Sequence, residues 1–278
     1  MMSTGFKTMV KLLTLIYIAT AIFWVLFARD PNDVSAGLYM QLLLFIVPFI
    51  GAIIGLYNAY HWGGLKSALG KAIGFISAGV FAWSIGMLIW CYYIFIAQVE
   101  IPYPSLADAI FILSWPLWAI GVLYLSRATG IRFALREMRG KILLVIVPLV
   151  AIALSYYLLV TVARGGVVEF DPSNAWKLFF DLFYPIGSAV IFTLALTFLS
   201  LSSAFLGGKY RVPIIILIVA FLVNFFADIT FSYTTTNGTY FNGYYPDMLF
   251  VTGMFLFALS LTLMAPPSDV GHQTEAET

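Results

Sequence analysis

The sequence predicts an all-α protein, a polytopic membrane helical bundle of eight transmembrane helices. Three observations support this fold class: a highly apolar composition, eight long apolar stretches and turn-forming residues between them. Of the 278 residues, 62% are hydrophobic and only 10% are charged, and the mean hydropathy is +0.98. Soluble domains carry roughly 25% charged residues. Because so few charges cannot cover a water-soluble fold, much of the surface is expected to face lipid.

Each apolar stretch is long enough for a transmembrane helix, which needs about 20 apolar residues. The stretches lie near residues 9–28, 38–60, 70–98, 106–126, 141–163, 175–205, 212–233 and 246–265. Lys7 and Lys11 precede the first stretch, as in a signal peptide, but no small-residue cleavage site follows it. We therefore expect it to remain as a helix. The expected organisation is one bundle over residues 1–266 and a short cytoplasmic tail over 267–278.

The segments between the stretches carry turn chemistry. They contain Asp30-Pro31-Asn32-Asp33, His61-Trp62-Gly63-Gly64, Pro102-Tyr103-Pro104, Gly165-Gly166, Asp171-Pro172, Gly207-Gly208 and Asn237-Gly238. Within the second span, Gly51-x-x-x-Gly55 offers a small-residue face for close helix packing. Pro116 and Pro185 lie inside spans four and six, where a missing backbone donor can bend the helix. Such bends near the outer ends of these spans would open a small vestibule.

The placement of lysine and arginine predicts the orientation of the bundle. With an inside N-terminus, the outer side holds only Arg29, Arg164 and Lys177. The inner side holds the other eleven cations: Lys7, Lys11, Lys66, Lys71, Arg127, Arg132, Arg136, Arg139, Lys141, Lys209 and Arg211. This positive-inside bias predicts a cell-membrane protein with both termini in the cytoplasm. The basic loop 127–141 is interpreted as a topology signal in preference to a contact with anionic lipid or a partner.

Several functional classes are disfavoured by composition. The net charge of +1 gives no bulk attraction to nucleic acid. Cys91 is the single cysteine, and His61 and His272 both lie outside the apolar cores, which disfavours a histidine-rich metal site. The chain lacks a Gly-x-Ser-x-Gly elbow and a His-Glu-x-x-His helix. We therefore expect no enzymatic activity, no metal and no cofactor, although a pair of aspartates leaves an intramembrane hydrolase as an alternative.

Nine of the thirteen acidic residues are expected at or toward the outer face. They are Asp30, Asp33, Glu100, Asp108, Glu169, Asp171, Asp181, Asp228 and Asp247. Asp108 completes a capping box with Ser105, Asp171 precedes a proline at a helix start, and Asp247 falls in a first turn. For these three residues, helix capping is preferred over a role in ligand binding.

Asp181 and Asp228 lie inside spans six and seven, where a charge in hydrocarbon costs a few kcal/mol. Asn224 and Ser232 extend a polar stripe from Asp228 at fourfold spacing, and Tyr184 and Ser188 extend a similar stripe from Asp181. Two interpretations stay open. The stripes either hold the helices in register, or they line an outward-facing pocket for a cation, a polar small molecule or a lipid headgroup. The second predicts that the two carboxyl groups face each other, away from lipid. The candidate ligand-binding residues are Asp108, Asp181, Tyr184, Asn224, Asp228 and Asp247.

The third and fourth spans resemble the seventh and eighth. The segment Tyr103-Pro104 with downstream Asp108 aligns with Tyr245-Pro246-Asp247 once a gap is allowed. In addition, aspartate is followed by an aromatic residue three positions later in four places, and this spacing puts both residues on one helical face. The four pairs are Asp108 and Phe111, Asp181 and Tyr184, Asp228 and Phe231, and Asp247 and Phe250. The pattern predicts hairpins repeated in parallel orientation.

Pro104-Ser105-Leu106-Ala107-Asp108 with downstream Trp115-Pro116 resembles the PSxAD…YP signature of a multi-spanning membrane sensor domain. That domain precedes diguanylate cyclase (GGDEF) or histidine kinase modules in bacteria and archaea. Asp181-Leu182-Phe183-Tyr184-Pro185, Ala227-Asp228 and the block from Gly238 to Asp247 are similar to its later parts, so the resemblance covers roughly residues 70–265. It implies a sensory or ligand-binding membrane domain. This sequence ends about a dozen residues after its last span, so any output would need a separate cytoplasmic signalling partner.

The expected function is therefore a stand-alone membrane sensory or ligand-binding module with an outward-facing acidic pocket. Two alternatives remain from the same residues. An ion-coupled transporter or channel fits repeats and carboxylates, although the middle of the bilayer looks apolar. A structural subunit of a larger membrane complex fits the sequence equally. The lipid bilayer is the one partner that the sequence itself requires.

Overall fold

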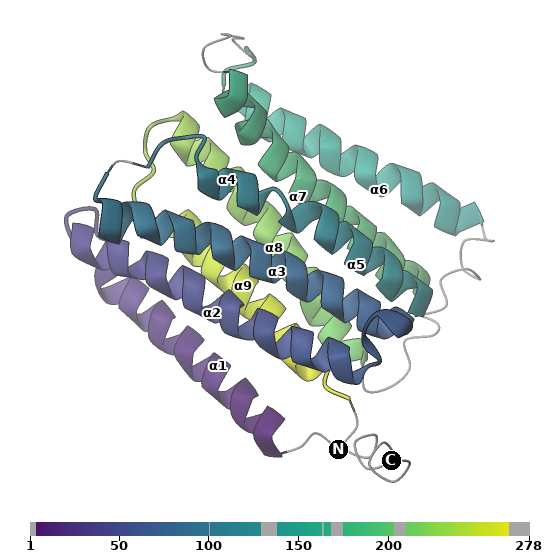
Figure 1. Ribbon diagram of the computed structural model, residues 1–278. Coiled ribbons are helices and arrows are strands. Elements are labelled where there is room, and N and C mark those ends of the chain that lie inside the picture. The colour runs from purple at the N-terminus through teal and green to yellow at the C-terminus, as the bar shows by residue number, and fades with distance from the viewer. Residues whose placement is uncertain are drawn as a thin grey trace.

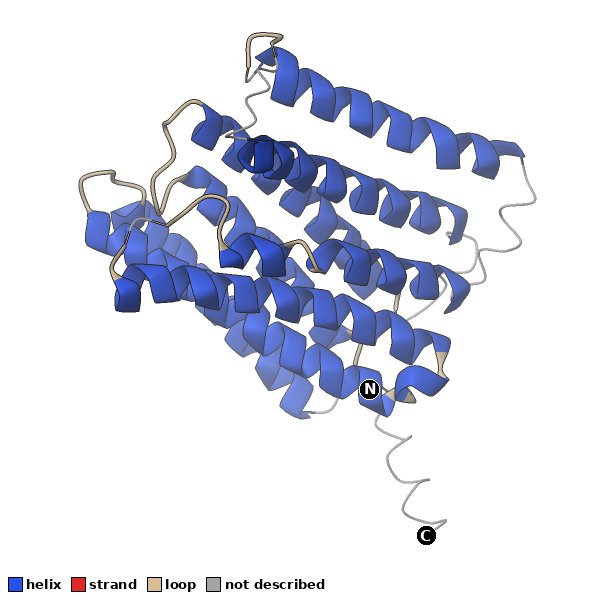
Figure 2. Ribbon diagram, turned by 45° about the horizontal axis from the view of Figure 1, so that its top comes forward, coloured by secondary structure: helices blue, strands red, loops and turns tan. Residues whose placement is uncertain are grey.

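The computed structural model describes residues 4–99, 101–128, 138–162, 164–167, 175–202 and 210–266, and the regular elements within them are all helical (Figure 2). Eight helices in these residues are long and apolar enough to cross a membrane. The predicted all-α fold and the eight spans are thereby confirmed, and the chain is a multi-pass membrane protein. Most of the basic loop, Glu100, Glu169, Asp171-Pro172, Gly207-Gly208, His272 and the tail lie outside the described residues.

The helices follow the predicted stretches to within a few residues. They are α1 Thr4–Phe23, α2 Val34–His61, α3 Ala68–Tyr92, α4 Leu106–Phe111, α5 Ser114–Ala128, α6 Met138–Tyr156, α7 Ala175–Ser202, α8 Arg211–Thr236 and α9 Tyr245–Leu263. Three spans continue into a wider π-helical turn, at Trp24–Ala28, Tyr93–Ala97 and Tyr157–Val162. A short 3-10 turn at Gly64–Lys66 joins α2 to α3.

Six of the spans form a closed ring. In order around the ring, α2 packs on α3, α3 on α5, α5 on α7, α7 on α8, α8 on α9, and α9 returns to α2. The remaining two spans lie outside it: α1 packs on α9 and α6 packs on α7, and they flank the bundle on opposite sides (Figure 1). Only 11% of the first span is buried, against 61% for α8 and for α9. The ring therefore encloses the protein interior, and α1 and α6 present most of their surface to lipid.

Small residues allow the ring helices to approach closely. A Cβ atom on Gly51 would lie 2.3 Å from Cβ of Ala258 on α9. One on Gly55 would lie 2.1 Å from Oγ of Ser77 on α3. Either side chain would push α2 away from its neighbours, so the Gly51-x-x-x-Gly55 face makes the close contacts that its spacing predicts.

The fourth span is not continuous, which corrects the prediction of one helix over 106–126. Helix α4 ends at Phe111 and α5 begins at Ser114. Pro116 explains the break, because it has no N–H to donate to the Ile112 carbonyl and its ring occupies the space where that bond would form. Ser105 starts α4 with the predicted capping box: its backbone N–H donates to Oδ2 of Asp108 at 2.6 Å, and its Oγ accepts from Ala107 N at 3.2 Å.

The two ends of the bundle differ in charge. We call the end that holds the loops 29–33, 101–105, 164–167 and 237–244 the acidic end, and the opposite one the basic end. Helix α4 and the loop from α8 to α9 lie together at the acidic end, while α1 begins and α9 ends at the basic end (Figure 1). The prediction that the acidic end faces outward rests on the distribution of lysine and arginine.

Candidate functional site

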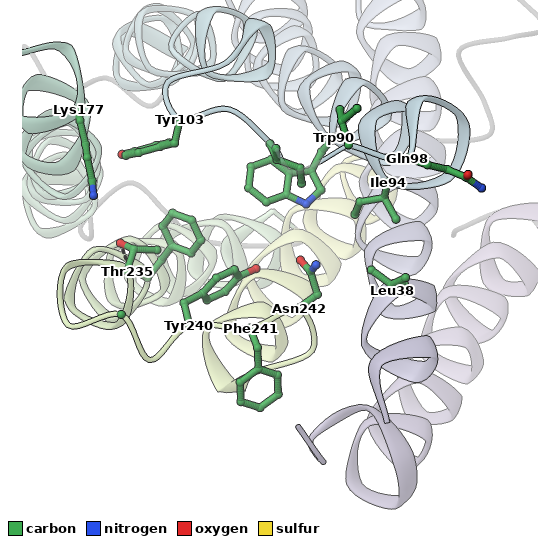
Figure 3. A pocket seen from close by; sticks show the side chains of 14 residues that line it. Leu38, Trp90, Ile94, Gln98, Tyr103, Lys177, Thr235, Tyr240, Phe241 and Asn242 are labelled. Atoms are coloured by element: carbon green, nitrogen blue, oxygen red, sulfur yellow. Dashed lines mark hydrogen bonds between the residues drawn. The ribbon is translucent and has the colours of Figure 1, made fainter. Parts of the chain in front are cut away.

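A vestibule of about 650 Å³ is hollowed into the acidic end. Its walls combine apolar side chains such as Leu38 and Ile94 with the polar groups of Gln98, Thr235 and Asn242 (Figure 3). Lys177 and Tyr103 lie together on one flank, and Gln98 and Leu38 lie on the opposite one (Figure 3). Trp90 and Tyr240 approach its middle from α3 and from the loop before α9. Lys177 is the one ionisable group other than tyrosine among the described lining residues.

A smaller cavity of about 60 Å³ lies deeper, inside the ring, and we call it the chamber. Each of the six ring helices contributes at least one residue to its wall, and so does the short helix α4 that leads into α5. Three carboxyl groups line it, those of Asp108, Asp228 and Asp247. Eight aromatic residues line it as well: Trp83, Trp90, Phe111, Trp115, Tyr184, Phe231, Tyr240 and Phe250. Trp90, Phe231 and Tyr240 line both cavities, so they form the neck between the vestibule and the chamber.

Asp108 is held at the chamber wall by donors from Ser105, which caps α4, and from α7. Its Oδ2 accepts from Oγ of Ser105 at 2.9 Å as well as from the capping backbone N–H, and its Oδ1 accepts from the Tyr184 hydroxyl at 2.6 Å. Asp108 is only 2% exposed. The bond to Tyr184 joins α4 to α7, so a residue that caps a helix also positions a wall of the chamber.

Asp247 occupies the matching place at the start of α9. Its Oδ2 accepts from the amide of Gln41 on α2 and from the backbone N–H of Gly243, both at 2.7 Å, and its Oδ1 accepts from the Tyr240 hydroxyl at 2.9 Å. Gly243 has φ of +91°, and a Cβ there would lie 2.3 Å from the Ala28 carbonyl oxygen. Glycine is therefore required for the loop to deliver its N–H to the carboxylate.

Asp228 on α8 has fewer partners than the other two. Its Oδ2 accepts a hydrogen bond from the Ser188 hydroxyl of α7 and another from the Asn224 amide at 3.0 Å. Trp115 donates from Nε1 to the same serine oxygen at 3.0 Å, so α5, α7 and α8 meet at this point. Within the described residues, Oδ1 of Asp228 has no hydrogen-bond partner, although the residue is only 6% exposed and lines the chamber.

Asp181 lies in a separate environment. Its carboxylate forms an ion pair with Arg164, with 3.0 Å between Nη2 and Oδ2, and accepts from the Tyr103 hydroxyl at 2.7 Å. Arg164 also donates to the Leu159 carbonyl and to Oγ1 of Thr236. Asp181 does not line the chamber or the vestibule. Its nearest link to α8 is the Ser232 hydroxyl, which donates to the Asp181 backbone carbonyl at 2.9 Å.

Two phenols at the acidic end act as donors to these carboxylates. Burial, followed by the neighbouring Asp181, raises the pKa of Tyr103 above its usual value, and burial with the neighbouring Asp247 raises the pKa of Tyr240. Both phenols therefore stay protonated at neutral pH and keep their hydrogens directed at the carboxylate oxygens. Of the two, only Tyr240 belongs to the wall of the chamber.

The aromatic residues of the chamber are in contact with one another. The rings of Tyr240 and Phe231 have centroids 4.8 Å apart, and those of Phe231 and Phe250 are 6.1 Å apart. Trp83 continues the series, at 5.9 Å from Phe250 and 5.6 Å from Phe111. Aromatic faces carry a negative electrostatic potential, so these rings reinforce the negative character that the carboxylates give the cavity.

The chamber is closed toward the basic end by three buried rings. Trp118 stacks on Phe257 with centroids 5.1 Å apart, and Phe221 meets Phe257 edge to face at 4.9 Å. Trp118 lies three residues beyond Trp115 on α5, and Phe257 lies seven residues beyond Phe250 on α9, so both lie on the basic side of the chamber. All three rings are at most 2% exposed. These packed rings separate the chamber from the basic end.

Four of the six candidate residues line the chamber: Asp108, Tyr184, Asp228 and Asp247. Asn224 does not line it but donates a hydrogen bond to Asp228. Asp181 belongs to the ion pair with Arg164. Both aspartates of spans six and seven are turned away from lipid, but they have different partners. Sequence reasoning missed the roles of Gln41 and Arg164. Two features of the sequence could have indicated these roles: Gln41 is a lone glutamine inside an apolar span, and Arg164 is one of the few arginines expected on the outer side.

No model of a known protein family matches the chain, and neither a curated protein nor a solved structure matches it. The resemblance to the PSxAD sensor domain therefore stays a prediction. Among the residues that the structure describes, no three histidine, cysteine or acidic side chains are grouped closely enough to hold a metal ion.

Proposed function

We propose that the protein is a membrane ligand-binding module of the sensory kind, whose chamber receives its ligand from the acidic end through the vestibule. One observation carries this proposal. Three carboxyl groups from three different helices converge on a cavity that contains no cationic side chain among its described lining residues. A charge that only holds helices together is normally paired or fully hydrogen-bonded. Asp228 lines the cavity instead with one oxygen that has no hydrogen-bond partner among the described residues.

The closed floor favours binding over conduction. A channel or transporter would need to separate Trp118, Phe221 and Phe257, which are in mutual ring contact and fully enclosed by the ring helices. A binding module needs no such path. Coupling to the cytoplasm then requires only that ligand binding shift the ring helices at the basic end, where a separate signalling partner would detect the movement.

The proposal is tested by thermal unfolding of the purified protein in detergent. The added compounds are small amines as chloride salts, small carboxylates as sodium salts, amino acids and uncharged alcohols. A compound present at 100 times its dissociation constant stabilises the folded state by about 2.7 kcal/mol, which raises the melting temperature measurably. We expect at least one class to stabilise the wild type and to lose most of its effect on Asp228→Asn.

The matched control is Asp30→Asn, which removes an exposed carboxylate at the same end of the bundle. It should respond to the compounds as the wild type does. Absence of stabilisation by every class would contradict the proposal. Uptake of the stabilising compound into liposomes that contain the protein would replace it with the transporter alternative.

A further inference from the structure

The chamber has acceptor capacity that the protein does not use. A carboxylate can accept about four hydrogen bonds. Asp108 and Asp247 each accept three, whereas Asp228 accepts two, both at Oδ2. Oδ1 of Asp228, a residue that lines the chamber, therefore has no donor among the described residues. This unused oxygen can accept a hydrogen bond from a ligand that carries N–H groups.

No described lysine or arginine faces the three carboxylates of the chamber. The Arg164–Asp181 contact is the one ion pair between described residues, and neither member lines the chamber. Lys177 lines the vestibule and not the chamber. The three chamber carboxylates are therefore balanced only by neutral donors, namely hydroxyl, amide and backbone N–H groups. A buried carboxylate without a counter-ion is unfavourable, and a bound cation removes that cost.

The geometry distinguishes an organic cation from a metal ion. Calcium takes six to eight oxygen ligands at about 2.3–2.6 Å, so its carboxylates must lie close together. The described acidic residues form no such group. Aromatic side chains line the same cavity as the carboxylates, and Trp83 contacts both Phe111 and Phe250. Rings that surround a cavity stabilise weakly hydrated ammonium groups through cation–π attraction.

Resting on the proposed function, we propose that the chamber binds a single organic ammonium group, and that the hydrocarbon chain carrying it passes the neck into the vestibule. The chamber, at about 60 Å³, has the volume of roughly two water molecules, enough for an ammonium group and its first carbon. The rest of the molecule lies in the vestibule of about 650 Å³, against Leu38, Ile94 and Val99.

Lys177 gives the site a second element of selectivity. It is the one lysine or arginine among the described residues of the vestibule, and it lies on the flank beside Tyr103 (Figure 3). A ligand with a second ammonium group at its far end would bring two like charges into the vestibule. The site should therefore prefer monoamines to diamines of the same length, and Lys177→Gln should reduce this preference.

The experiment is calorimetric titration of the purified, detergent-solubilised protein with hexylammonium chloride. Hexanol and sodium hexanoate have the same chain length and serve as neutral and anionic comparisons. We expect binding of hexylammonium and none of hexanol or hexanoate. Asp228→Asn should weaken it by about 30-fold, because truncation of a desolvated charge partner costs 2 kcal/mol or more. Asp30→Asn should bind as the wild type does.

A second pair of variants keeps the test independent of the folding of Asp228→Asn. Trp83→Leu should weaken hexylammonium by about 3- to 30-fold, the range expected for a lost cation–π contact, with no gain for hexanol. Lys177→Gln changes an exposed residue, and it should raise the affinity for 1,6-diaminohexane relative to hexylammonium. Equal affinity of the wild type for both amines, unchanged in Lys177→Gln, would contradict the assigned position of the ligand.

The outcomes separate the two proposals. Binding of hexanoate or hexanol in place of hexylammonium, with loss in Asp228→Asn, overturns the ammonium assignment and leaves the ligand-binding function standing. Binding of hexylammonium that is equally strong in Asp228→Asn and Trp83→Leu overturns the chamber as its site. Tetramethylammonium has no N–H group. If it binds as tightly as hexylammonium, the ligand's ammonium group does not act by donating a hydrogen bond to Asp228. If no class of compound binds or stabilises the protein, both proposals are wrong.

Discussion

Asp181 and Asp228 look equivalent in the sequence but occupy opposite electrostatic situations in the fold. Both are more than nine-tenths buried in the contact between α7 and α8. Asp181 is paired with the Arg164 guanidinium and the Tyr103 hydroxyl. Asp228 lines the chamber and has only neutral donors, both of them on Oδ2. The comparison shows that a loop arginine neutralises one of the two buried carboxylates, whereas the described residues provide no cation for the other.

The largest expected effect is loss of the cation in the paired site. Arg164→Met leaves Asp181 as an unpaired buried charge, which we expect to destabilise the protein by about 3–5 kcal/mol. Thermal unfolding in detergent measures the change. In the double variant Arg164→Met with Asp181→Asn, most of the loss should be recovered. A change in Arg164→Met no larger than that in the exposed control Arg29→Met would contradict the description of this ion pair.

Neutralising the two aspartates should have opposite effects on stability. Asp181→Asn leaves the Arg164 guanidinium without its counter-ion, so it should destabilise the fold by about 3 kcal/mol. Asp228→Asn keeps a hydrogen-bond acceptor for Ser188 and removes a charge that has no cation. It should be neutral or stabilising by up to about 1 kcal/mol while weakening hexylammonium binding. Equal destabilisation by both variants would remove the distinction between the two sites.

The smallest expected effect concerns the phenols. Tyr103→Phe removes the hydroxyl that donates to Asp181, and Tyr240→Phe removes the one that donates to Asp247. Each should lower stability by about 1.5 kcal/mol, as expected for a hydrogen bond to a charged group. Only Tyr240→Phe should also change hexylammonium affinity, because Tyr240 lines the chamber that holds the ammonium group, whereas the Tyr103 hydroxyl is bonded to Asp181 outside it. An altered affinity in Tyr103→Phe without one in Tyr240→Phe would reverse the assignment of the two sites.

The aromatic wall of the chamber is the part of the site that the sequence predicts best. Each of the four aspartates is followed three residues later by an aromatic residue, and these four residues, Phe111, Tyr184, Phe231 and Phe250, all line the chamber. The spacing works because residues three apart share a helical face. In a lipid-facing bundle, the face that carries a carboxyl group turns inward, and its aromatic neighbour turns with it.

Other features depend on how the helices are arranged, which local pattern does not determine. Gln41 reaches Asp247, 206 positions away in the sequence, because α9 closes the ring against α2. Arg164 pairs with Asp181 and not with Asp228 because its loop precedes α7 at the acidic end. Pro116 predicts a break in the fourth span. The sequence does not predict how deep in the membrane that break between α4 and α5 lies.

The most direct test of the ammonium assignment is a crystal structure of the protein with 6-bromohexylammonium. We expect the ammonium nitrogen in the chamber, within hydrogen-bond distance of Oδ1 of Asp228. The anomalous signal of bromine should lie in the vestibule beside Leu38 and Ile94. Bromine inside the chamber, or a ligand found only on the lipid-facing surface of α1 or α6, would contradict the account.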